Sequence, residues 1–187
     1  LIEGNKLMKN SNYTWPAISF HWLIAIGIFI CFPIGMYMAD LKLSPLKLQL
    51  ISYHKWLGVT IFGLLVLRIV WRSFNKPPAL PSTMPKWQIG LSHATHLALY
   101  LLMIAIPVSG WLMSSAKGYT TVYLGMFPLP DLLEKDKALG HNLAELQEIL
   151  NYFLLLLVGL HIGAAIKHHI IDRDDILTRM SPWIKRK

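Results

Sequence analysis

QEILNYFLLLLVGLHIGAAIKHH, residues 147–169, is long and apolar enough to cross a bilayer, yet His161 lies deep inside it. A histidine in hydrocarbon costs free energy unless a partner stabilises it, and an ionisable group inside a membrane span marks a functional site. Another segment of the chain is therefore expected to supply a partner for His161.

The composition is that of a membrane protein. Hydrophobic residues make up 54% of the 187 residues, whereas roughly 45–50% is usual in a soluble domain. The length fits a single domain, residues 1–187. The one cysteine, Cys31, excludes a disulfide, a cysteine-ligated zinc and an iron–sulfur cluster. Residues 1–7 precede Met8 and resemble a tag remnant or an upstream extension, so they are left out of the fold prediction.

Four segments are predicted to cross the membrane as helices, at about residues 15–39, 51–74, 87–116 and 143–171. The proline-rich connection 75–86 cannot be helical throughout. The longest connection, 117–140, is rich in aromatic residues, which predicts a segment lying on the membrane interface. The predicted fold is therefore an all-α membrane protein, a four-helix bundle with residues 1–14 as an arm and 172–187 as a cytoplasmic tail.

The net charge of +8 is explained by membrane topology. Basic residues cluster in the arm, around the second connection and after the last helix: Lys6, Lys9, Arg68, Arg72, Lys76, Lys86, Lys167, Arg173, Arg179, Lys185, Arg186 and Lys187. The positive-inside rule then places both termini in the cytoplasm. The expected partner is the lipid bilayer, and no nucleic acid is expected, because the charge flanks the spans.

The buried polar residues fall at two depths. His21 and His161 each lie about 9 Å from the cytoplasmic boundary on different helices. His54 lies near the outer end of the second helix, and Gln147 is at the matching depth on the last. Residues 14 apart on a helix are separated by about 21 Å and share a face, so His54 aligns with Arg68 and Gln147 with His161. Two polar sites are therefore predicted inside the bundle, an inner one at His21 and His161 and an outer one at His54 and Gln147.

The inner site has the groups that a six-coordinate haem requires. Two imidazoles facing each other at one depth are suitable axial ligands, and helix bundles build cofactor sites between facing helices. We expect haem b between His21 and His161, with Arg68 as the partner of a propionate. The alternatives are a hydrogen-bonded histidine pair that links helices and an arginine that extends to the interface.

Five motifs, which span residues 17–180 in order, resemble the prokaryotic cytochrome b561 family of four-helix, usually dihaem cytochromes of the bacterial inner membrane. They are ISFHWL (18–23), HKWLG (54–58), LRIVWR (67–72), THLALYLL (95–102) and GLHIGAAIKHHIIDRDDILTRM (159–180). The resemblance implies that iron is ligated by His21 and His161 in an inner haem and by His54 in an outer one.

The outer site departs from the family pattern. The residue 14 before His161 is normally histidine in the family, and here it is Gln147. The outer haem is therefore five-coordinate on His54, completed by another side chain, or absent; without haem, His54 is an interfacial histidine. His141 could serve as the ligand only if the helix unwinds before Gln147.

The remaining histidines are predicted to have roles other than ligating iron. His93 and His96, on one face of the third helix, are expected to be a hydrogen-bonding or quinone-adjacent pair rather than ligands. His168 and His169, at the cytoplasmic boundary, are either solvated or lipid-facing, or handle protons for a quinone.

The resemblance implies electron transfer between the quinone pool and a periplasmic donor or acceptor, and superoxide oxidation coupled to ubiquinone reduction is one oxidoreductase activity it allows. One alternative is a haem-containing anchor subunit that relays electrons for a partner dehydrogenase. Another is a haem-free proton channel or transporter that uses the histidines, although no span shows the paired broken helices of secondary transporters.

Overall fold

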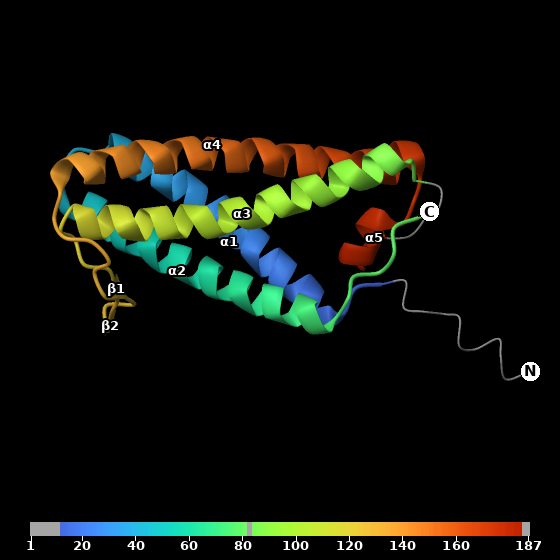
Figure 1. Cartoon of the computed structure of the whole chain (residues 1–187), viewed down its shortest axis with the longest axis horizontal. Coiled ribbons are helices and arrows are strands. Elements are labelled where there is room, and N and C mark those ends of the chain that lie inside the picture. The colour runs from blue at the N-terminus through green and yellow to red at the C-terminus, as the bar shows by residue number, and fades with distance from the viewer. Residues whose placement is uncertain (1–11, 82–83, 185–187) are drawn as a thin grey trace, which may run out of the picture.

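The computed structural model describes residues 12–81 and 84–184, so residues 1–7 lie outside the described part. Four long helices form its frame: α1 (Trp15–Asp40), α2 (Pro45–Phe74), α3 (Lys86–Ala116) and α4 (Lys137–Lys167). They run along the length of the molecule (Figure 1), and each is long and apolar enough to cross a membrane. The predicted all-α membrane bundle is confirmed.

Two helices begin earlier than the sequence analysis predicted, because a polar side chain caps each start. The Ser44 hydroxyl accepts a hydrogen bond from the Lys47 N–H at 3.3 Å, and Pro45 takes the first helical position. On α4, the Asp136 carboxylate accepts from the Leu139 N–H at 3.0 Å. The helices therefore start at residues 45 and 137 rather than near 51 and 143, which places His54 in the third turn of α2.

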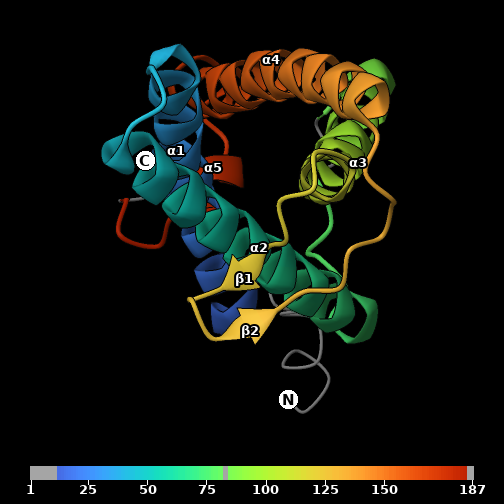
Figure 2. The same cartoon turned by 90° about the vertical axis from the view of Figure 1, so that its left-hand side faces the viewer.

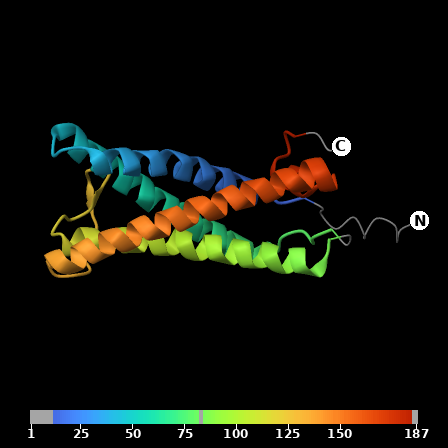
Figure 3. The same cartoon turned by 90° about the horizontal axis from the view of Figure 1, so that it is seen from above.

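The helices pack as two pairs. α1 lies along α2 and α3 along α4, with fewer contacts between α2 and α3; Figures 2 and 3 show the two pairs from the end and from above. A cluster of buried apolar side chains lies between α1 and α2, where Leu65 is fully buried against Ile24, Cys31 and Ile61. Many large apolar side chains remain exposed along the helices, as a lipid-facing surface requires.

A short hairpin lies beside α2 near one end of the bundle (Figure 1). Strand β1 (Val122–Tyr123) pairs antiparallel with β2 (Phe127–Pro128) inside the connection that was predicted to lie on the interface. Positive φ angles at Leu124 and Gly125 form its turn. The Trp56 indole donates a hydrogen bond to the Val122 carbonyl at 2.8 Å, which attaches the hairpin to α2.

The opposite end carries the C-terminal elements and the start of α1 (Figure 1). α4 passes into a π-helical turn, η2 (His168–Asp172), and then a short helix, α5 (Ile176–Met180), in the predicted tail. The Trp22 indole donates to the Met180 carbonyl at 2.9 Å, so α5 is held against α1. We call this the inner end and the hairpin end the outer end.

Candidate functional site

The four helices carry two layers of residues at which helices meet closely. The inner layer consists of His21 on α1, Arg68 on α2, His96 on α3 and His161 on α4, and the outer layer of Gly35, His54, Gly110 and Gln147 on the same helices. On every helix the two members are 14 residues apart, which separates the layers by about 21 Å along the helix and keeps both members near one face.

The inner layer is a cluster of three imidazoles. The ring of His161 lies 6.2 Å from that of His21 and 5.2 Å from that of His96, measured between centroids. The structure therefore brings together His21 and His161, the pair predicted from matching depth. It also brings His96 into the cluster, a residue that was not expected to be a ligand.

The spacing of these rings distinguishes the two pairs. An imidazole nitrogen bonds a first-row metal ion at about 2 Å, and the ring centre lies about 1 Å behind it, so two imidazoles on opposite sides of one ion have centroids about 6 Å apart. The 6.2 Å between His21 and His161 fits this requirement, and the 5.2 Å between His96 and His161 is shorter. The residues of the inner layer thus fit a haem iron between His21 and His161.

His96 is fixed by its own helix. Its Nδ1 lies 2.7 Å from the Ser92 carbonyl oxygen, so Nδ1 carries a proton and donates a hydrogen bond there, which in the neutral ring leaves Nε2 unprotonated. The sequence contained a signal for this residue, because His96 and Gly110 have the same 14-residue spacing as His161 and Gln147. The proximity of α3 to His161 depends on how α3 crosses α4, which the sequence pattern does not contain.

Arg68 lies beside the inner cluster without a carboxylate. Its guanidinium donates to the Ala17 carbonyl at 2.7 Å and to the Tyr100 hydroxyl at 3.0 Å. Among the described residues it forms no ion pair. A small hollow adjoins it, lined in part by Arg72 and Asn75. A cation at membrane depth favours an anionic partner, so the position suits a haem propionate.

In the outer layer, His54 is held by the backbone of α1. Its Nδ1 lies 3.1 Å from the Cys31 carbonyl oxygen and 3.3 Å from the Cys31 sulfur. Donation from Nδ1–H to the carbonyl leaves Nε2 unprotonated, which is the state in which an imidazole binds a metal. The ring packs against Gly35, where an added Cβ would lie 2.9 Å from the His54 Cε1.

Gln147 occupies the outer layer of the other helix pair. An added Cβ at Gly110 would lie 2.9 Å from the Gln147 Nε2, so this side chain lies against α3. α4 runs without interruption through Gln147. The side chain of His141 is 75% exposed and pairs with Glu145 at 3.2 Å. The alternative in which the helix unwinds and His141 takes the ligand position is therefore wrong.

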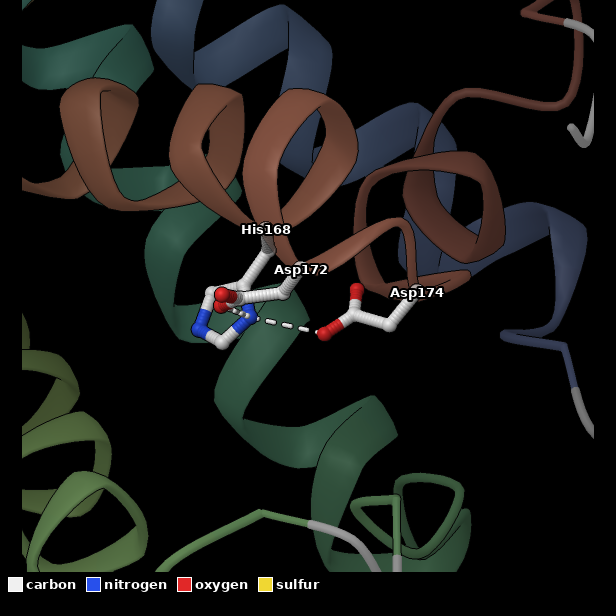
Figure 4. A group of neighbouring side chains, drawn as sticks. All are labelled: His168, Asp172 and Asp174. Atoms are coloured by element: carbon white, nitrogen blue, oxygen red, sulfur yellow. Dashed lines mark hydrogen bonds and ion pairs between the residues drawn. The ribbon is translucent and has the colours of Figure 1, made fainter.

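A second polar group lies at the inner end of α4 (Figure 4). The His168 Nδ1 is 2.7 Å from an oxygen of Asp174 and 3.0 Å from one of Asp172. Lys167 pairs with the same Asp172 oxygen at 2.6 Å. The ligand atoms of His168, Asp172 and Asp174 are close enough together to hold a metal ion. The ammonium group of Lys167 already balances the charge of Asp172, so this cluster does not require a metal ion. Because the His168 side chain is only 14% exposed, the solvated or lipid-facing interpretation is wrong for it.

Comparisons with known proteins identify the relatives of this chain. The family model described as prokaryotic cytochrome b561 matches residues 12–183. Cytochrome b561 homolog 2 of Escherichia coli (strain K12) is 37% identical over 164 residues, which cover 87% of each chain. Probable superoxide oxidase CybB of Yersinia pestis is 26% identical over 181 residues, 92% of this chain and 97% of the relative. Cytochrome b561 homolog 1 of Escherichia coli (strain K12) is 27% identical over 92% of this chain and 98% of its own.

Proposed function

Since this chain belongs to the prokaryotic cytochrome b561 family of b-type haem membrane electron-transfer proteins, we propose that it carries electrons between the quinone pool and a donor or acceptor on the periplasmic side of the bacterial inner membrane. Both termini lie in the cytoplasm in this proposal. The sequence supports the orientation, because most of its Lys and Arg residues, Arg72, Lys76 and Arg173 among them, belong to the segments assigned to the cytoplasmic side.

In this proposal His21 and His161 are the residues that would hold the iron of the inner haem. The observation that carries the assignment is their 6.2 Å centroid separation, which matches two imidazoles on one iron. His96 remains a neighbour of the site, since its 5.2 Å separation from His161 is too short for a second axial pair. Arg68 neutralises a propionate.

The haem supplies one-electron chemistry when bound. The chain contributes the surroundings that set its potential. The ligand imidazoles would hold the iron, the Arg68 cation would offset the charge of a propionate, and the apolar walls of the bundle would exclude water. Tyr100 accepts from Arg68 at 3.0 Å and thereby holds the guanidinium near the cluster.

The direct test is haem content and its dependence on His161. We expect purified protein to show a Soret band and an α-band after reduction, and His161→Ala to lose the bis-histidine signal of one haem. His141→Ala is the matched control, because that side chain is on the same helix and 75% exposed. A colourless, folded protein after haem-replete expression would refute the proposal and favour a haem-free channel or transporter.

The identity of the electron donor separates two forms of the proposal. The Yersinia pestis relative is named as a probable superoxide oxidase. If this chain has that activity, the isolated protein reduces ubiquinone when superoxide is supplied. Absence of such reduction in a haem-replete preparation would exclude superoxide as its donor.

A relay role for a partner dehydrogenase is the second candidate, and the hairpin favours it. Met126 and Phe127 in the hairpin are 67% and 59% exposed, so the hairpin presents apolar side chains at its surface. In this form of the proposal the hairpin docks the partner. A dehydrogenase subunit that copurifies with the native protein, and is lost when both residues are changed to serine, is the expected result.

A further inference from the structure

The outer layer contains one histidine. The chain has eight histidines, all of them among the described residues, and six lie in the inner half of the bundle or at its inner end: His21, His93, His96, His161, His168 and His169. The seventh, His141, is exposed and paired with Glu145. Only His54 remains as an imidazole inside the bundle at this level.

His54 is prepared for a metal bond. The Cys31 carbonyl, 3.1 Å away, takes the Nδ1 proton and leaves the Nε2 lone pair free. Gly35 lets the ring lie directly against the α1 backbone, since an added Cβ would come within 2.9 Å. These two contacts set the tautomer and the position of one strong axial ligand.

Gln147 is the polar group of the facing helix pair at this level. Its amide is a weak ligand for haem iron, whose usual protein ligands are histidine, cysteine, methionine and tyrosine. The amide nitrogen is, however, a hydrogen-bond donor. The Gln147 side chain forms no hydrogen bond with any described residue, although its backbone carbonyl accepts one from Asn151 at 2.8 Å. The amide is therefore available to a ligand.

We propose that the outer layer holds a second haem through His54 alone, and that the remaining iron position, at the level of Gln147, binds small diatomic ligands. This proposal rests on the haem-binding function above. In haem proteins the polarity and hydrogen-bond donors of the pocket opposite the axial histidine decide how such ligands are held. Gln147 supplies that donor here, so the outer centre differs in kind from the bis-histidine inner centre.

The experiment uses carbon monoxide as the probe on the dithionite-reduced, detergent-solubilised holoprotein. We expect two haems per chain by pyridine haemochrome, one of which shifts its Soret band on addition of carbon monoxide. His54→Ala is expected to lose that haem and the shift together, while the low-spin spectrum of the inner haem is retained.

Two substitutions at one position separate coordination from polarity. Gln147→His supplies a second imidazole, so the carbon monoxide shift is expected to disappear while the haem count stays at two and the high-spin ferric signal becomes low-spin. Gln147→Leu keeps the position open but removes the donor. It should retain one carbon monoxide per chain, with a higher C–O stretching frequency than the unaltered protein.

The outcomes are separable from those of the functional proposal. Two haems that both ignore carbon monoxide would overturn the inference, because another side chain would then fill the position. One haem per chain, unchanged in His54→Ala, would overturn it by removing the outer haem while the inner centre stands. A protein with no haem would refute the functional proposal itself.

Discussion

Gly35 lets the His54 ring pack against α1, because an added Cβ would lie only 2.9 Å from the His54 Cε1. Gly35→Ala is therefore expected to displace His54 and reduce the haem and carbon monoxide binding of the outer centre, with the inner centre unchanged. Haem per chain and the carbon monoxide difference spectrum measure both effects.

The matched control is Gly63→Ala on α2, where an added Cβ meets no atom within 4 Å. It should keep both centres and gain up to about 1 kcal/mol of helix stability. Equal spectra for the two alanine variants would show that the contact at Gly35 does not position His54.

At the residue scale the sequence predicted the inner pair better than its surroundings. His21 and His161 could be matched because depth follows from distance to a charged helix end. The contact of His96 with His161, and that of His54 with Cys31, depend on how helices cross. The angle at which two helices cross is set by side-chain packing between them. The pattern of apolar residues along one helix does not predict that angle.

At the scale of the element, the starts of α2 and α4 are set by local caps. The Asp136 side chain satisfies the Leu139 N–H, and removing such a cap costs about 1 kcal/mol. Asp136→Ala is expected to lower the midpoint of thermal unfolding in detergent by about 2–4 °C. Glu134→Ala, two residues away and exposed, is the control that should leave it unchanged; equal midpoints for the two variants would contradict the role of the cap.

The same caps explain why the helices could be predicted but their starts could not. Hydropathy identifies the segment that lies in hydrocarbon, and all four were found. The first turns of α2 and α4 contain charged and polar residues and extend beyond that segment. Ser44 before Pro45 is a recognisable start signal for a helix. The start was instead predicted at residue 51, where the apolar segment begins.

At the scale of the whole molecule, the hairpin and the α2–α3 connection lie at opposite ends of the bundle, so they should face opposite sides of the membrane (Figure 1). In intact spheroplasts, a thiol reagent that does not cross membranes is expected to label Met126→Cys and to leave Lys76→Cys unlabelled. The native Cys31, 9% exposed, provides the low background. The reverse labelling pattern would invert the proposed orientation.

The 14-residue spacing shared by all four helices has an electrical consequence. The two layers are separated by about 21 Å, roughly 70% of a hydrocarbon core of about 30 Å. One electron that passes between them therefore moves charge through most of the transmembrane voltage, worth about 1.6 kcal/mol for each 100 mV. With haem in both layers and the orientation proposed above, inward electron transfer would work against an interior-negative potential and outward transfer would be driven by it, so the membrane voltage would favour outward electron flow.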